Sequence, residues 1–149
     1  MRSQQNLVKL IEYDSQEYQQ ACQLRYRLFY AEHNLAWDKV FNDSDLNCFH
    51  LAIVELGKVL AYAQLFPQKN LHYQIKQIVV EPKHRKQNLG IQILQATLDL
   101  AKERGATSLS LNSRVRAIGF YQKLGFQTYG VEFPSPTTGV IHIAMKLKL

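Results

Sequence analysis

The sequence predicts one α/β domain with a mixed sheet, in which antiparallel strands come first and a parallel strand–helix–strand unit lies in the middle of the chain. Its 149 residues suit a single domain. Residues 50–55 and 59–66 are β-rich runs on either side of a short glycine-containing turn, which is the pattern of an antiparallel hairpin. A strand pattern over 71–80, a helical pattern over 89–104 and a strand pattern over 108–112 follow. A crossover of that length joins parallel strands with a right-handed connection.

The segment before the hairpin is predicted as a strand, a helix and a mixed connection. Residues 7–13 are short and apolar, which is typical of a strand. Asp14 followed by Glu17 has the spacing of a capping box, so a helix is expected to begin there and to extend to about Tyr30. Residues 31–47 show no clear period and are predicted as a short helix and a loop. One stripe at three- and four-residue steps supports the first helix: Tyr18, Cys22, Arg25, Leu28 and Phe29.

The central unit has recognisable ends. Glu81 precedes Pro82, and the residue before a proline is pushed away from helical geometry, so the strand over 71–80 is expected to end there. Alternation within that strand is imperfect, which predicts burial on both of its faces. Gly105 stops the following helix. The apolar stripe of this helix consists of Leu89, Ile93, Ala96 and Leu100.

The C-terminal part is predicted as a helix and a last strand. Residues 115–124 form the helix, which Gly125 ends, and the strand covers about 140–147. We expect the last strand to be exposed. An exposed strand edge can pair with a second copy of the chain, so a homodimer is a possible assembly.

Composition excludes several classes of protein. Hydrophobic residues make up 46% and charged residues 20%, which is ordinary globular usage. The longest apolar runs fall far short of the ~20 residues that cross a bilayer, and Met1–Asn6 is polar with no apolar stretch after it, so we expect a cytoplasmic protein without membrane contact. Cys22 and Cys48 are too few for a disulfide framework or a zinc site, and no metal is expected. A formal charge of +6 favours anionic partners.

The basic surplus is concentrated where the strand over 71–80 leads into the helix over 89–104. Free amides at a helix start, together with the helix dipole, favour phosphate binding. Asn88 and Gly90 are the residue types that best turn backbone amides towards a ligand with positive φ. The cations Lys83, Arg85 and Lys86 surround this point. A phosphate site is therefore one interpretation of the segment, and a solvated basic connection is the other.

Two motifs in this order resemble the Gcn5-related N-acetyltransferase (GNAT) family over about residues 7–147. Residues 85–90 match the family's Arg/Gln-x-x-Gly-x-Gly/Ala phosphate loop, with Asn88 in the first glycine place. Residues 117–126 match the family's Ala-x-x-Phe-Tyr-x-Lys-x-Gly-Phe segment. Within the family, the 24–32 helix and the 141–145 strand are similar to the small ElaA-like bacterial branch. Arg114 stands where many members carry an asparagine.

The resemblance implies the transfer of an acetyl group from acetyl-CoA to a primary amine on a small molecule or a peptide. It implies that the pantetheine arm lies along one strand, that the pyrophosphate lies on the loop, and that Tyr121 is the general acid for the departing thiolate. The cofactor-binding residues that it implies are Ile78, Val79, Val80, Arg85, Lys86, Gln87, Asn88, Leu89, Gly90, Ile91, Asn112 and Lys123.

The general base is left open by the sequence. His72 and His142 are the better-placed titratable residues, and a chain of water molecules is the alternative. Two rival functions also remain: a CoA-binding sensor without catalysis, and a basic module that binds nucleic acid through phosphate contacts. No recognition motif for nucleic acid is evident, so nucleic acid is not expected as a partner.

Overall fold

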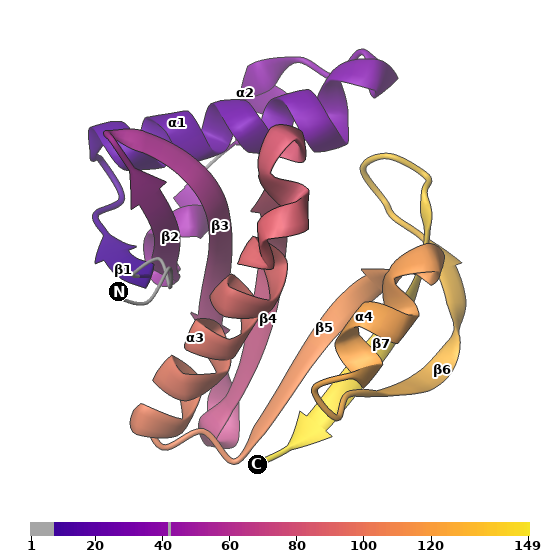
Figure 1. The fold of residues 1–149 in the computed structure, drawn as a ribbon. Helices are drawn as coiled ribbons and strands as arrows, with labels where there is room; N and C mark the ends of the chain where they lie inside the picture. The colour runs from indigo at the N-terminus through magenta and orange to yellow at the C-terminus, as the bar shows by residue number, and fades with distance from the viewer. Residues whose placement is uncertain (1–7, 42) are drawn as a thin grey trace.

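The structure, a computed structural model, describes residues 8–41 and 43–149, and the side chains of residues 85–87 lie outside this description. The described residues form one seven-stranded mixed sheet with the strand order β1-β2-β3-β4-β5-β7-β6 (Figure 1). The strands are β1 Val8–Ile11, β2 Phe49–Glu55, β3 Lys58–Pro67, β4 His72–Val80, β5 Ser108–Arg114, β6 Gln127–Pro134 and β7 Ile141–Lys148. The α-helices are α1 Gln16–Arg25, α2 Trp37–Val40, α3 Leu89–Glu103 and α4 Ile118–Gln122. A π-helical turn, Tyr26–Tyr30, continues α1, and short 3-10 turns cover Ala31–His33, Asp43–Asn47, Lys69–Leu71, Pro82–Gln87 and Val115–Ala117.

The predicted fold class is confirmed. The first four strands pair antiparallel in chain order. β4 precedes α3 in the chain and β5 follows it. These two strands pair parallel, as the crossover pattern predicts. The last three strands of the sheet order return to antiparallel pairing.

Two hydrophobic clusters cover the two faces of the sheet. The cluster around α1 includes Ala21 and Leu24 of the helix and Tyr62 of β3. The cluster around α3 includes Ile93 of the helix and Leu65 of β3, and residues of α4 pack against it. α3 buries its stripe against the sheet because its apolar positions recur at helical spacing. The α1 side and the α3 side are named below after these helices.

The first helix begins one residue later than expected. Ser15, not Asp14, is the N-cap: its hydroxyl accepts a hydrogen bond from the Tyr18 backbone N–H at 3.1 Å. The same hydroxyl donates to the Glu12 carbonyl at 2.7 Å, which fixes the turn that enters the helix. Helical structure then continues through Tyr30, as predicted, although its last turn is π-helical.

The last strand is not at an edge of the sheet, so the expectation of an exposed strand edge there is wrong, although most of its side chains are exposed or half-buried. β7 lies between β5 and β6, and Met145 at its centre is fully buried. The edge strands are β1 and β6. A homodimer that forms by strand pairing would therefore use one of those two strands. Within the described residues, no helix combines the length and the apolar character that spanning a bilayer requires.

Candidate active site

β4 and β5 lie side by side only at their beginnings. Their pairing runs from His72 opposite Ser108 to Gln74 opposite Ser110. Beyond these positions the two strands diverge (Figure 1), and a cleft of about 340 Å³ lies between them. From Ile75 onward β4 has no described strand partner on this side. The backbone N–H and C=O groups of β4 that point to this side are thus available to an extended ligand, as at the edge of any open sheet.

A bulge at Gln77 interrupts β4 beside the cleft. The pairing of β3 with β4 steps from Tyr62 opposite Val79 to Gln64 opposite Lys76, so β4 has one residue more than β3 at this point. Gln77 has φ +58°, in the left-handed region that non-glycine residues rarely adopt. Strained backbone of this kind persists only where surrounding contacts hold it, and it is common at functional sites.

The bulge explains the irregular alternation of β4. Tyr73 and Ile75 belong to the α3-side cluster, whereas Val79 belongs to the α1-side cluster. An extra residue moves the side chain of every residue that follows it in the strand to the opposite face of the sheet. Before the bulge only one face of the strand is buried, so the expected burial on both faces is wrong there.

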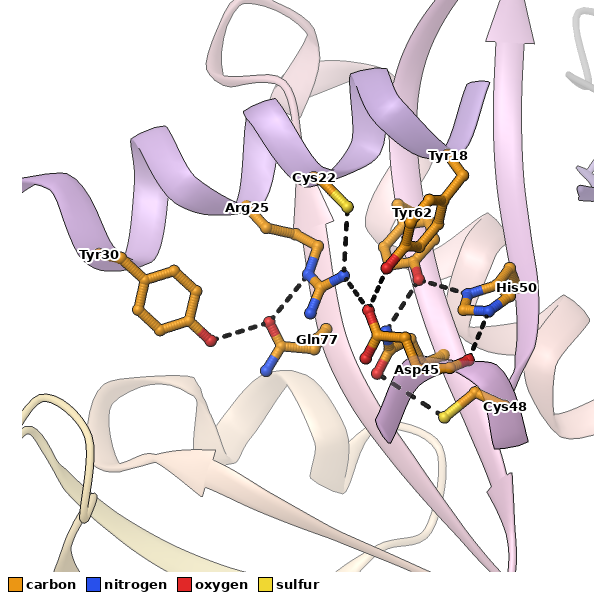
Figure 2. A network of polar contacts seen from close by, with 10 residues as sticks. Tyr18, Cys22, Arg25, Tyr30, Asp45, Cys48, His50, Tyr62 and Gln77 are labelled. Atoms are coloured by element: carbon orange, nitrogen blue, oxygen red, sulfur yellow. Dashed lines mark hydrogen bonds and ion pairs between the residues drawn. The ribbon is translucent and has the colours of Figure 1, made fainter. Parts of the chain in front are cut away.

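A buried polar network on the α1 side holds the bulge (Figure 2). Arg25 of α1 donates from Nε to the Gln77 side-chain oxygen at 3.1 Å, and the Tyr30 hydroxyl donates to the same oxygen at 3.2 Å. The Arg25 guanidinium also pairs with Asp45 at 2.9 Å, and both of these side chains are more than 90% buried. The Tyr18 hydroxyl donates to the same carboxylate. The conformation of Gln77 therefore depends on an ion pair that does not itself line the cleft.

Charge and burial oppose one another in this network. Burial on its own would raise the pKa of Asp45, but the Arg25 guanidinium and the Tyr18 hydroxyl outweigh it, and the pKa is lowered. Burial lowers the pKa of His50 and keeps its ring neutral. The neutral ring fits its contacts, since Nδ1 accepts from the Tyr62 hydroxyl at 2.6 Å and Nε2 donates to the Asp45 carbonyl at 2.9 Å.

The start of α3 has the geometry that the phosphate-loop interpretation requires at Asn88. This residue has φ +61° and ψ +23°, which confirms the predicted left-handed conformation. Gly90 differs from the expectation, because it lies within the helix and is not among the positive-φ glycines. A Cβ at Gly90 would lie 3.3 Å from the Phe120 ring and 3.8 Å from Val80. Glycine is needed at this position for close packing, not for its dihedral angles.

The remaining loop residues contribute differently. The side chains of Arg85, Lys86 and Gln87 lie outside the described part of the structure. Leu89 is fully buried, so only its backbone can face a ligand, and Ile91 is half-buried. Among the described residues, the one buried side-chain polar atom without a hydrogen-bond partner is Nδ1 of His84, in the 3-10 turn before α3. An unpaired buried nitrogen beside a helix start is a position where a ligand oxygen would be favourable.

Tyr121 of α4 lies in the wall of the cleft. Its ring packs edge-on against Phe120 at 5.0 Å and Phe126 at 6.2 Å between centroids. Within the described part of the chain its hydroxyl has no hydrogen-bond partner. Burial raises the pKa of Tyr121 to about 12, although the nearby Arg114 guanidinium acts in the opposite direction. The phenol is therefore protonated at neutral pH.

The two candidate bases lie in different environments. His142 of β7 lines the cleft, and its Nδ1 lies 2.8 Å from the Val140 carbonyl, an acceptor that fixes the proton on Nδ1 and leaves a lone pair on Nε2. His72 lies at the closed end of the β4–β5 pair, which is the end where the two strands are still paired. Both of its ring nitrogens contact serine hydroxyls, Ser108 at 2.6 Å and Ser110 at 2.9 Å. The structure brings His142, but not His72, to the same cleft as Tyr121.

The other predicted cofactor residues are only partly gathered in the cleft. Ile78 and Asn112 line it, whereas Val79 and Val80 do not. Lys123 follows α4, is exposed, and is absent from the lining. The described residues contain no group of three histidine, cysteine or acidic side chains that could hold a metal ion.

Sequence reasoning missed the part of the site that depends on distant residues. Arg25 is placed in an apolar stripe by its spacing, but its guanidinium joins Asp45, twenty positions further along the chain. The signal that could have indicated this is a charged residue within an otherwise apolar stripe, because buried charges need a partner. Lys76, also missed, lines the cleft.

Comparison with known proteins gives consistent matches. The model of the acetyltransferase (GNAT) family matches residues 11–126. A UPF0039 protein of Schizosaccharomyces pombe is 30% identical over 129 residues, which is 85% of this chain and 84% of that protein.

Two solved structures have the same fold. Escherichia coli ElaA has a TM-score of 0.79 at 19% identity, over 95% of this chain and 100% of that one. An aminoglycoside 6'-N-acetyltransferase complexed with coenzyme A has a TM-score of 0.76 at 16% identity, over 95% of this chain and 96% of that one.

Proposed function

Since the chain belongs to the acetyltransferase (GNAT) family, we propose that it transfers an acetyl group from acetyl-CoA to a primary amine by direct attack, with Tyr121 as the general acid and His142 as the base. The observation that carries the proposal is the divergence of β4 from β5. It leaves one edge of β4 open beside the cleft that Tyr121 and His142 line.

The open edge and the start of α3 suit the two ends of one long ligand. Pantetheine is an extended chain with amide groups, so it can pair with the backbone of β4 around Ile78 as an added strand would. The left-handed Asn88, the first amides of α3 and the His84 nitrogen, which has no partner among the described residues, suit the diphosphate. The residues present therefore fit the cofactor, which supplies the acetyl group as an activated thioester.

Tyr121 and His142 have complementary proton states. The half-buried phenol of Tyr121 keeps its proton at neutral pH and can donate it to the leaving sulfur. The Nε2 lone pair of His142 can accept a proton from the attacking amine, because the Val140 carbonyl holds the other nitrogen as a donor. The ring of His142 also stacks on Phe133 at 6.2 Å, which restricts its orientation.

Replacing His142 with glutamine should lower kcat by about 100-fold, the lower part of the range for general acid–base catalysis. The acidic limb of the kcat pH profile should disappear, because this limb reports the protonation of the base. Steady-state rates measured between pH 5 and pH 9 check both expectations. If the limb persists in His142→Gln and is lost in His72→Gln, the base is His72 and the assignment is overturned.

The activity itself is tested by mixing the protein with acetyl-CoA and a panel of primary amines and measuring the release of free thiol. We expect amine-dependent release.

We expect Asn88→Ala to destabilise the fold by about 1 kcal/mol and to weaken CoA binding by about tenfold, since alanine disfavours the left-handed conformation that directs the first amides of α3.

Asn70→Ala is the matched control for this variant. Asn70 has φ +60° in the turn before β4, so the backbone cost is the same, but this turn lies at the closed end of the β4–β5 pair. CoA affinity, measured by calorimetry, should be unchanged in Asn70→Ala. Equal CoA affinity in both variants would contradict a diphosphate site at Asn88, and thermal unfolding of both would show whether the backbone costs match.

A cytoplasmic location is also part of the proposal. Cys22 and Cys48 are both free thiols, which fits a reducing compartment. Cell fractionation tests it, and recovery of the protein outside the cytoplasm would refute it.

A further inference from the structure

One wall of the cleft is a polar sheet face with basic side chains from three strands. Lys76 of β4 and Arg114 of β5 both line the cleft. Arg114 lies directly opposite His142 of β7 in the strand register. Asn112, also in the lining, lies two residues before Arg114 and therefore on the same face. Arg114 and Asn112 thus share one face with the proposed base, and Lys76 lines the same cleft from β4.

The described lining of the cleft contains positive charges without acidic residues among them: none of these residues is an aspartate or a glutamate. The buried carboxylates of the described residues are already paired with arginines: Asp45 with Arg25, and Glu81 with Arg27, each at 2.9 Å. Glu32 is exposed and lines a neighbouring hollow, which Arg114 also lines, and no ion pair between the two is formed among the described residues. Lys76 and Arg114 contact aromatic rings instead, with Lys76 at 4.5 Å from the Phe66 centroid and Arg114 at 5.2 Å from that of Phe29.

The proposed cofactor does not account for these charges. Its diphosphate is assigned to the start of α3, at Asn88, whereas Lys76 lies four residues before the end of β4. Lys76 lies opposite Gln64 of β3 and next to the Phe66 ring, on the α1 side, whereas Leu89 at the α3 start belongs to the α3-side cluster, against which Val80 packs. The part of the cofactor that would lie along β4 is uncharged pantetheine. The positive charge of this wall is therefore available to bind the acceptor.

We propose that the acceptor is a primary amine that carries a carboxylate on the same molecule, and that Lys76 and Arg114 bind this carboxylate. The inference rests on the proposed acetyl transfer and names the substrate class of that site. Arg114 offers a planar fork of donors that matches a carboxylate, and Lys76 adds a second positive charge. A polycationic amine would bring further positive charge into a cleft with no described acidic lining residue.

The same two cations also favour the chemistry. Like charges nearby disfavour the ammonium form of an amine, so the bound acceptor loses its proton more readily than it does in water. The carboxylate balances one of the two positive charges, and the other still disfavours the ammonium form of the amine, which must become neutral before it attacks. An acceptor with both groups therefore gains binding and reactivity from one arrangement of side chains.

The experiment compares acceptors that share an amine and differ in one carboxylate. Nα-acetyl-lysine and Nα-acetyl-lysine amide have the same ε-amine, and cadaverine lacks the carboxylate and has a free amine where Nα-acetyl-lysine has its acetamide. For N-terminal amines, Gly-Glu-amide and Gly-Gln-amide form the equivalent pair. We expect kcat/KM to be about tenfold higher for the carboxylate-bearing member of the accepted pair, a difference of about 1.4 kcal/mol. The pair that shows it distinguishes a lysine-like acceptor from a peptide N-terminus.

Charge reversal at Lys76 provides the variant test. Lys76→Glu should abolish the preference for the carboxylate-bearing acceptor and raise kcat/KM for the amide or for cadaverine. Lys69→Glu changes the net charge equally on an exposed turn at the closed end of the β4–β5 pair, and it should keep the wild-type preference. If Lys76→Glu does not fold, Arg114→Gln takes its place. The preference of this variant for the carboxylate-bearing acceptor should also be smaller than that of the wild-type protein.

The outcomes distinguish a failure of the carboxylate inference from a failure of the proposed acetyl transfer. Equal or better use of the amide or of cadaverine, with thiol release intact, overturns the carboxylate inference and leaves acetyl transfer standing. If no probe is acetylated, calorimetric titration of the CoA-bound protein with each pair decides, and binding without preference for the carboxylate also overturns the inference. Absence of both CoA binding and thiol release refutes the proposed function itself.

Discussion

Replacing Tyr121 with phenylalanine should lower kcat by about 10²–10⁴-fold, the usual contribution of a general acid, while CoA affinity stays unchanged. The phenylalanine ring keeps the packing against Phe120 and Phe126. Only the donor to the leaving sulfur is lost. Single-turnover rates with acetyl-CoA, together with calorimetric CoA binding, check the result.

Tyr129→Phe is the matched control, because Tyr129 is exposed on β6 and the same hydroxyl is removed away from the cleft. It should retain the wild-type rate. Unchanged turnover in Tyr121→Phe would contradict the acid role. Intact CoA binding without measurable turnover in the wild-type protein would favour the alternative of a sensor that binds CoA without catalysis.

The alkaline pH profile gives a second readout of Tyr121. Burial raises its pKa to about 12, so ionisation of this phenol should not limit the rate below about pH 11. The same shift affects stability. An unfolded tyrosine ionises near pH 10, so the contribution of Tyr121 is fully present below pH 10 and is lost as the pH rises from 10 towards 12.

Replacing Asp45 with alanine should lower the free energy of unfolding by about 3–5 kcal/mol, because it leaves the Arg25 guanidinium buried without its counter-charge. This is a large part of the ~5–15 kcal/mol that stabilises a typical domain. Urea denaturation of the two proteins measures the difference. Asp45→Asn, which keeps the shape and part of the hydrogen bonding, provides a milder variant if the alanine protein does not fold.

The double variant Arg25→Met/Asp45→Leu separates the cost of an unpaired charge from the value of the pair. Replacing both charges with apolar groups is often neutral, so the double variant should be more stable than Asp45→Ala. Lys9→Met/Glu17→Leu is the control, since this exposed pair at 3.3 Å should change stability by less than about 1 kcal/mol. A loss of less than about 1 kcal/mol in Asp45→Ala would contradict a buried ion pair.

The network also predicts the direction of acid unfolding. The pKa of His50 is lowered by burial, so its neutral form stabilises the fold above about pH 6.5, and this stabilisation is lost as the pH falls below that value. The pKa of Asp45 is also lowered, and its contribution is present above about pH 3.9 and lost below it.

Features that depend on a few neighbouring residues could be predicted well. The hairpin, the parallel crossover and the stop at Gly105 follow from turn residues and periodicity within short windows. Asn88 is left-handed as expected, because asparagine is the non-glycine residue that tolerates this conformation best. The capping-box spacing predicts the helix cap one residue too early, at Asp14, because Ser15 beside it is an equally good capping type.

Features that depend on contacts between distant segments could not be predicted. The insertion of β7 between β5 and β6 is a choice among strand orders that all satisfy the same alternation. The bulge at Gln77 is held by Arg25 and Tyr30 from another element, and no local pattern in β4 records that support.

The sequence by itself determined the order of the elements, the direction of β4 relative to β5, and the helix start that suits a diphosphate. These follow from local backbone preferences and from the period of apolar residues. Only the tertiary structure decided where β4 and β5 diverge, which histidine reaches the cleft, and which charges line it. The reason is that burial and ion pairing are properties of three-dimensional proximity, and residues twenty or more positions apart acquire it only when the sheet assembles.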